Sequence, residues 1–184
     1  CEPILQKYTD ENFTGVTFRP ATVCGYSPRQ RFDVSVNILT NHAVNNGKII
    51  VFGGKQLRPN LHIQDYCDVV KLLMRVSSKK IQNQIFNVGH QNLSIMQIAK
   101  KVKKIVQKKF GYKSIKIEVQ KSHDNRSYHI NSSKIYRDLK FKPKKKIEDA
   151  INELCIALKK KKYKNPLFND IYFNVRTLLK KKVY

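Results

Sequence analysis

The fold is decided by an alternation that starts at Gly15-Val16-Thr17-Phe18-Arg19, a short stretch rich in strand-forming residues. A loop with glycine, proline and arginine follows over 24–31. Apolar residues at helical spacing then predict a helix over 32–44, which Gly47 stops, and a second strand follows over 49–52. A strand, a helix and a strand in this order predict an α/β protein.

The same alternation continues along the rest of the chain. Ser94 is expected to cap one helix, and Asp65 is interpreted as the cap of another. Five strands of modest length do not make a complete doubly wound sheet, so the chain has the pattern of the second half of a larger α/β protein. Further strands are predicted over 57–63, 85–88 and 115–119, and helices over 2–12, 64–76, 95–106, 132–139, 147–158 and 166–179.

Length and composition exclude several classes of protein. The 184 residues suit one domain or part of one, and no repeat or long linker divides them. No apolar run approaches the roughly 18 residues of a membrane span, and 41% hydrophobic residues are too many for a disordered chain. We therefore expect one region over 1–184, with a helical tail over 166–184 and no membrane partner.

The formal charge of +24, from 37 Lys+Arg against 13 Asp+Glu, has two interpretations. Lysine neutralises phosphates, which would fit a nucleic-acid-binding module. Alternatively, the lysine runs cover solvated helix faces. Arginines and aromatic residues are sparse in those runs, which favours the solvated faces over a nucleic-acid partner.

The four cysteines and five histidines show no spacing typical of a metal site. We interpret the cysteines as reduced thiols and expect a cytoplasmic protein. The first residue is Cys1 rather than methionine, so we also expect the chain to begin inside a longer gene product.

Five short motifs carry the functional signal when they are read together and in order. They are RPATVCG (residues 19–25), VFGG with RPNLHIQD (51–54 and 58–65), FNVG (86–89), DNRSY (124–128) and LKFKP (139–143). In this order they resemble the C-terminal part of the NAD-dependent epimerase/dehydratase family, which are extended short-chain dehydrogenases acting on nucleotide sugars. The resemblance runs to about Leu158 and implies the last Rossmann strands plus a smaller α/β substrate-binding domain, without the N-terminal Rossmann half.

The resemblance also implies roles for three residues at a strand end and for two arginines. The backbone of Pro20 and Ala21 would line the NAD cofactor, and Thr22 would face the substrate. Arg58 and Arg126 would bind the diphosphate of a nucleotide sugar, where two guanidinium forks suit the many acceptor oxygens. Without the motif context, each arginine would be an ordinary surface or ion-pair residue.

The same resemblance implies three more substrate contacts. At one position the sequence departs from the family. Phe52 would contact the nucleotide base, although a core strand aromatic is the competing interpretation. Asp33 and Val34 would begin the helix that covers the nucleotide. Lys140 replaces the glycine usual in the family, which would cost on the order of 1 kcal/mol if its backbone is left-handed.

The family's glycine-rich dinucleotide loop and its catalytic Tyr-x-x-x-Lys pair are missing. No tyrosine with a lysine four residues later stands beside a predicted strand end, so we assign no catalytic residue. We expect the nucleotide-sugar-binding part of an NAD-dependent epimerase or dehydratase (an isomerase or lyase of carbohydrate biosynthesis), homodimeric when intact and inactive as this piece alone. The alternatives are the nucleic-acid-binding module and a catalytically dead nucleotide-sugar binder.

Overall fold

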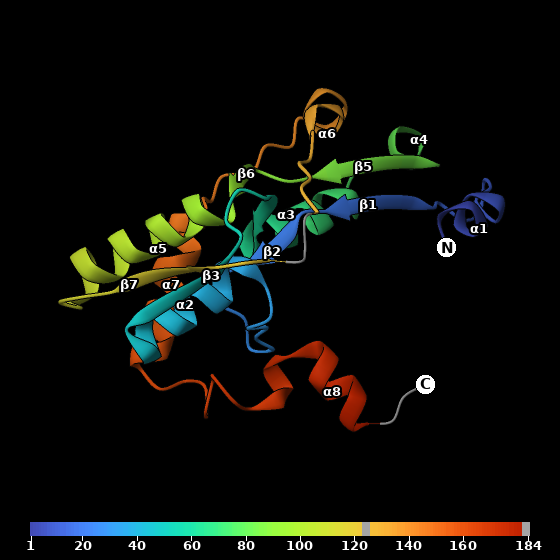
Figure 1. Cartoon of the computed structure of the whole chain (residues 1–184). Helices are drawn as coiled ribbons and strands as arrows, with labels where there is room; N and C mark the ends of the chain where they lie inside the picture. The colour runs from blue at the N-terminus through green and yellow to red at the C-terminus, as the bar shows by residue number, and fades with distance from the viewer. Residues whose placement is uncertain (123–125, 182–184) are drawn as a thin grey trace.

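The computed structural model describes residues 1–122 and 126–181, and it confirms the predicted α/β class (Figure 1). The strands are β1 Val16–Pro20, β2 Thr22–Cys24, β3 Lys48–Phe52, β4 Leu57–His62, β5 Gln84–Val88, β6 Gln91–Ser94 and β7 Lys116–Gln120. The helices are α1 Glu2–Lys7, α2 Ser35–Asn46, α3 Ile63–Leu73, α4 Ser78–Ile81, α5 Ile95–Phe110, α6 Ser133–Leu139, α7 Ile147–Lys159 and α8 Asn174–Lys180, with a 3₁₀ turn η1 Asp170–Tyr172.

The strands form three small sheets in which parallel pairing dominates. β1 pairs with β5, β2 with β4, and β3 with β7, all parallel, while β6 adds antiparallel to β4. Parallel strands end at the same edge of their sheet, and such edges are where α/β proteins form ligand crevices. Pro20 therefore ends beside Val88, and Cys24 ends beside His62.

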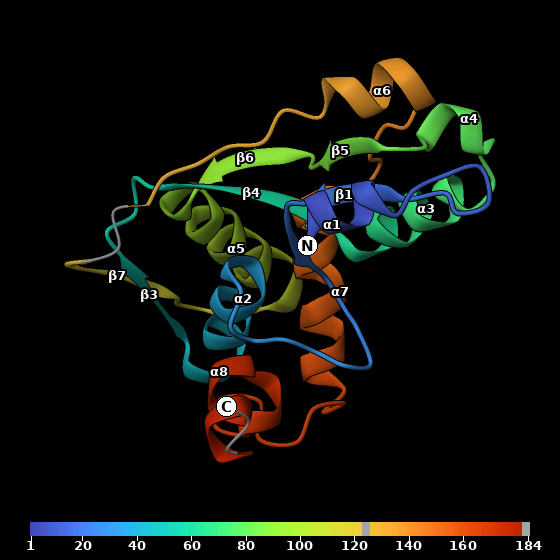
Figure 2. The same ribbon diagram turned by 90° about the vertical axis from the view of Figure 1, so that its right-hand side faces the viewer.

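Three apolar clusters hold these elements together. The largest packs α2, α5 and α7 against β3, with Val36, Ile98 and Ile151 fully buried. A second cluster joins the β1–β5 sheet to α3 and α6 around Phe86. A third is mainly aromatic and joins α7 and the chain after it to Phe32. Figure 2 shows that this last stretch of chain turns back beneath α2.

Several helix ends were predicted correctly from neighbouring residues in the sequence. Ser94 caps α5 as expected, because its hydroxyl accepts from the Gln97 N–H at 3.1 Å while the Gln97 side chain accepts from the Ser94 N–H at 2.8 Å. Gly47 ends α2 in the left-handed region, at φ 64°. Both ends were predicted because capping chemistry depends only on neighbours in the sequence.

The interpretation of Asp65 as a helix cap is wrong. The His62 side chain caps α3, because its Nδ1 accepts from the Gln64 N–H at 3.0 Å. Asp65 is 1% exposed, and its carboxylate accepts from the backbone N–H groups of Lys144 and Lys145 at 2.8 and 3.0 Å. This carboxylate therefore fixes the segment before α7, almost 80 residues away in the chain.

Two strands were missed and some predicted bounds shift. β2 has only three residues and directly follows Pro20, whereas β6 is mostly polar, so neither shows the apolar run of a buried strand. The helix expected over 2–12 ends at Lys7. Val119, near the end of β7, is 59% exposed, and among the described strands β7 pairs with β3 alone.

Replacing Lys140 with glycine is expected to stabilise the protein by about 1 kcal/mol. Lys140 ends α6 at φ 56°, the left-handed conformation considered above, and its side chain is exposed. Urea unfolding followed by circular dichroism measures the change. The matched control is Lys142→Gly, at an exposed position without positive φ, which should be neutral or destabilising. Equal effects at both positions would contradict the assignment of strain to Lys140.

Candidate functional site

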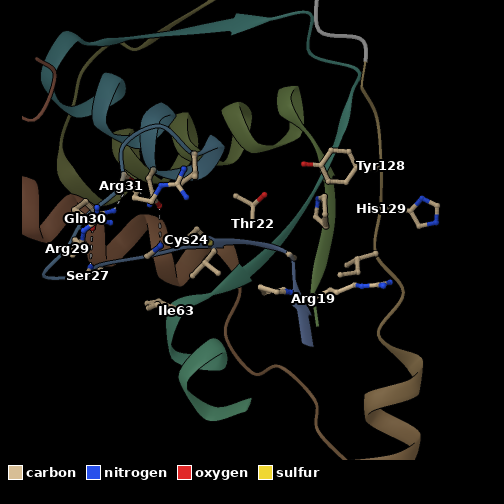
Figure 3. A pocket seen from close by; sticks show the side chains of 18 residues that line it. Arg19, Thr22, Cys24, Ser27, Arg29, Gln30, Arg31, Ile63, Tyr128 and His129 are labelled. Atoms are coloured by element: carbon tan, nitrogen blue, oxygen red, sulfur yellow. Dashed lines mark hydrogen bonds between the residues drawn. The ribbon is translucent and has the colours of Figure 1, made fainter. Parts of the chain in front are cut away.

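A cavity of about 630 Å³ opens where β1 and β2 end (Figure 3). Its floor includes Pro20, Ala21 and Thr22, the three residues predicted at the strand end. One wall is the loop over 25–31, and the opposite wall is the segment 128–130. Figure 3 shows Thr22 between Arg31 of the loop and Tyr128 of the other wall. The strand end is thus a site for a ligand of small-molecule size.

Gly25 is required where the loop leaves β2. Its φ of 117° disfavours other residues, and a Cβ there would approach His62 Nε2 to 3.2 Å. The Gly25 N–H donates to Asn37 Oδ1 at 3.2 Å, and Asn37 Nδ2 donates to the Arg31 carbonyl at 2.9 Å. Buried Asn37 therefore ties both ends of the loop to α2.

The thiol in this cavity is not a nucleophile. Cys24 is 1% exposed, and burial raises the pKa of its thiol to about 12, with the nearby Glu153 and Asp65 carboxylates acting in the same direction. At neutral pH the side chain is therefore a neutral thiol that packs like a small apolar group.

Alkylation should separate the four cysteines into two pairs. At pH 8 we expect iodoacetamide to modify exposed Cys1 and Cys67, whereas Cys24 and Cys155 react roughly 100-fold more slowly or less. Burial raises the pKa of Cys155 to about 12 as well. Peptide mass spectrometry against time measures the four rates, and the urea-unfolded chain serves as control. Modification of Cys24 as fast as Cys67 would contradict its burial.

A smaller cavity of about 220 Å³ adjoins the start of α2 and contains Phe52 and Arg58. Phe52 is 55% exposed, so it is not the core aromatic of the competing interpretation. His42 also lines this cavity, and burial lowers its pKa, which keeps the imidazole neutral at neutral pH. An exposed aromatic face beside a guanidinium suits a planar base attached to a phosphate.

The structure brings Arg58 and Arg126 together, although they are 68 positions apart. Arg58 Nη1 donates to the Arg126 carbonyl oxygen, and the Arg58 guanidinium lies 5.2 Å from the centre of the Tyr128 ring. The Ser127 hydroxyl accepts from the Leu57 N–H at 2.9 Å, which holds the second segment along β4. Asp124 and Asn125 of the same motif lie outside the described residues.

Ser35 is a site residue that the sequence did not indicate. It begins α2 and lines the smaller cavity, while its neighbour Val34 lines the larger one. The Ser35 hydroxyl is buried and has no hydrogen-bond partner within 1–122 and 126–181. Within the part of the chain that the structure describes, no side chain caps α2, so its first N–H groups have no side-chain acceptor there. An unpaired hydroxyl beside a helix N-terminus favours an anion between the two cavities.

Asp33, predicted as a substrate contact, lies at neither cavity wall. Its carboxylate accepts from Arg31 Nε and from the Asn174 N–H, both at 2.9 Å. Burial acts to raise the pKa of Asp33, but these two hydrogen bonds outweigh it and lower the pKa. The carboxylate therefore joins the cavity loop to α8, and its substrate contact stays a prediction.

No catalytic tyrosine–lysine pair lines either cavity. The spacing Tyr-x-x-x-Lys occurs twice, as Tyr112 with Lys116 and as Tyr136 with Lys140. The first pair lies between α5 and β7, and the second lies on α6. Neither pair lines the two cavities described above, so neither is placed to act on a ligand there.

The lysines are distributed over many elements. Lys48, Lys134 and Lys180 each form an ion pair on a different part of the surface. The densest group lies on α5, where five lysines surround a hollow of about 330 Å³ whose lining includes no aromatic residue. This distribution favours solvated faces over a base-stacking nucleic-acid groove.

Residues 1–122 and 126–181 show neither a candidate metal cluster nor a helix that could cross a membrane. These residues contain no group of three or more His, Cys, Asp or Glu side chains arranged around a possible metal ion. None of the helices there has both the length and the apolar character needed to cross a bilayer.

A family model matches the first part of the chain. Residues 1–89 match the NAD dependent epimerase/dehydratase family. The resemblance seen in the motifs is thereby confirmed for this part, which contains the strand end, the cavity loop and Arg58.

Solved structures extend the likeness over most of the chain. A UDP-glucose 4-epimerase from Thermotoga maritima with UDP-glucose has a TM-score of 0.72 and 22% identity, and the match covers 88% of this chain and 52% of that one. A UDP-glucuronic acid 4-epimerase from Bacillus cereus, with UDP-glucuronic acid and NAD, has a TM-score of 0.70 and 23% identity over 86% and 49%. A dTDP-glucose 4,6-dehydratase from Bacillus anthracis, with NAD, has a TM-score of 0.64 and 20% identity over 82% and 46%.

These similarities establish the epimerase/dehydratase fold. The chain spans about half the length of each of these structures, in agreement with the expected C-terminal portion.

Proposed function

We propose that this chain is the nucleotide-sugar-binding part of an NAD-dependent sugar-nucleotide epimerase or dehydratase. The observation that carries the proposal is that Arg58 and Ser35 line the smaller cavity while their chain neighbours Pro59 and Val34 line the larger one. Arg58 Nη1 donates to the Arg126 carbonyl, and the Ser35 hydroxyl has no hydrogen-bond partner within residues 1–122 and 126–181. Guanidinium forks and helix N–H groups are the donors that diphosphates prefer.

The two cavities then receive the two ends of the ligand. The smaller one, with the exposed ring of Phe52, suits the nucleotide base. The larger one, with Thr22 at the strand end, suits the sugar. A diphosphate between them would bridge the ends of one extended molecule, which explains why the predicted contacts are divided between two cavities.

The strand end also fits one end of the NAD cofactor. Pro20 and Ala21 are small, and both line the larger cavity beside Thr22. The Ala21 N–H already donates to the Val88 carbonyl at 2.7 Å, so that amide is not free to bind a cofactor. NAD would accept a hydride from a sugar carbon, while this chain holds the sugar nucleotide beside it. Most of the cofactor contacts are proposed to come from another part of the protein.

Several properties of the intact protein remain proposals. We propose a cytoplasmic homodimer of carbohydrate biosynthesis that acts as an isomerase or lyase. The glycine-rich loop and the tyrosine–lysine pair that the resemblance implies for either reaction are not among the 184 residues.

Calorimetric titration of the purified chain tests the function. We expect UDP-glucose, UDP-glucuronic acid or dTDP-glucose to bind with a micromolar to millimolar Kd, and free glucose to give no heat. With NAD present, the chain alone should convert none of them, and turnover would contradict its proposed inactivity. Failure of every nucleotide sugar, combined with tight binding of a DNA duplex, would favour the nucleic-acid alternative.

A further inference from the structure

The chain after α7 packs against the loop that forms one wall of the larger cavity. Figures 1 and 2 show that this C-terminal segment (160–174) turns back beneath α2. The Phe32 N–H donates to the Tyr172 carbonyl at 2.8 Å, and Asn41 Nδ2 donates to the Pro166 carbonyl at 2.9 Å. With the bond from the Asn174 N–H to Asp33, three main-chain groups of the segment are fixed.

An aromatic cluster completes this contact. Phe32, fully buried, packs edge-on against the rings of Tyr163 and Tyr172, with centroid distances of 5.3 and 5.4 Å. Tyr163 and Tyr172 are each only 8% exposed. Edge-to-face aromatic pairs have a defined geometry, so the segment is held in one orientation against the loop.

The polar centre of the contact is the pair Tyr163–Gln30. The Tyr163 hydroxyl donates to Gln30 Oε1 at 2.8 Å and lies 3.2 Å from the Ser27 carbonyl oxygen. Gln30 is 2% exposed, and its Oε1 also accepts from the Ser27 N–H at 3.1 Å, while its Nε2 donates to the Arg31 carbonyl. Burial raises the pKa of Tyr163, so the hydroxyl keeps its proton and remains a donor.

We propose that Tyr163 is a positioning residue for the ligand cavity, because its hydroxyl fixes Gln30 and thereby the shape of the wall over 25–31. Ser27, Gln30 and Arg31 all line the cavity, and all three take part in the Gln30 network. Losing the hydroxyl leaves a buried amide oxygen with one donor fewer, which loosens the loop without removing any cavity residue. That the wall faces a sugar rests on the proposed function, whereas the positioning itself does not.

Hydrogen exchange of the full 184-residue chain tests the positioning. In Tyr163→Phe, exchange in peptides covering 26–34 should be about fivefold faster, because a net hydrogen bond is lost. Tyr172→Phe is the matched control, since it removes a hydroxyl from the same cluster and that hydroxyl has no hydrogen bond to the loop within the described residues. Exchange over 95–110 should be unchanged in both variants. Equal exchange of the loop in the two variants would overturn the proposal.

Titration with UDP and UDP-glucose supplies a readout that a general loss of stability would not give. Tyr163→Phe should bind UDP-glucose about fivefold more weakly and bind UDP within about twofold of the unmodified chain. Equal weakening of both would overturn the specific role of the wall. If the unmodified chain binds neither probe, that result counts against the proposed function, and hydrogen exchange still decides the positioning.

Discussion

Arg58→Ala is expected to weaken the binding of UDP or dTDP by about 100-fold, equivalent to about 2.7 kcal/mol. Arg58 lines the smaller cavity, and a guanidinium is able to donate to two oxygens of a diphosphate. The alanine variant loses the charge and the fork together. Titration calorimetry at fixed ionic strength measures the loss, because salt screens the phosphate contact.

Three further variants separate the role of Arg58 from a general effect of charge. Arg58→Lys keeps the charge but loses the bidentate fork, so it should lie between the alanine variant and the unmodified chain. Arg126→Ala should cost less, about tenfold, because Arg126 is exposed and lines neither cavity. Arg75→Ala, on an exposed residue after α3, should change nothing. Equal losses in Arg58→Ala and Arg75→Ala would exclude a specific diphosphate contact.

The strand ends, several helix ends and the family were predictable from the sequence because their signals are local. Ser94 caps its helix through a residue three positions away, and Gly47 ends α2 through its own backbone. The motif around Pro20 likewise depends on a strand ending at a proline, and this strand end does line the larger cavity. Such features require no knowledge of distant contacts.

The features that were missed depend on contacts between distant parts of the chain. Asp65 has the spacing of a helix cap, and only the folded chain shows that Lys144 and Lys145 donate to it. Asp33 likewise stands at the start of a predicted helix, but it binds Asn174, 141 positions later. Ser35 carries no sequence signal beyond its place near a helix start, since what marks it is a buried hydroxyl without a hydrogen-bond partner among the described residues.

The end of the chain also shows this limitation, because its apolar pattern did not mark the contacts that attach the C-terminal segment. Apolar spacing predicted a helix over 166–179, but α8 covers only Asn174–Lys180, starting at the last residue of the segment. The apolar residues behind that prediction are largely exposed, including Val175 and Leu178. The contacts that attach the segment are made instead by tyrosines and main-chain groups that no helical period marks.

Phe32→Ala is expected to lower the free energy of unfolding by about 3–5 kcal/mol. The ring is fully buried, and it packs against Tyr163 and Tyr172 where α7, the C-terminal segment and the cavity loop meet. Alanine would leave a cavity there that the surrounding rings cannot fill without losing their edge-on contacts. Urea unfolding followed by circular dichroism gives the free energy.

The matched control is Phe168→Ala, the same chemical change in the same segment at a residue that is 78% exposed. It should shift the free energy of unfolding by less than about 0.5 kcal/mol, because little apolar area leaves water there on folding. A loss below about 1.5 kcal/mol for Phe32→Ala would mean that the aromatic cluster contributes little to the folded state, since burying such a side chain is itself worth about that much. A loss in the expected range, with Phe168→Ala neutral, would show that the buried ring of Phe32 contributes to the folded state and that the exposed ring of Phe168 does not.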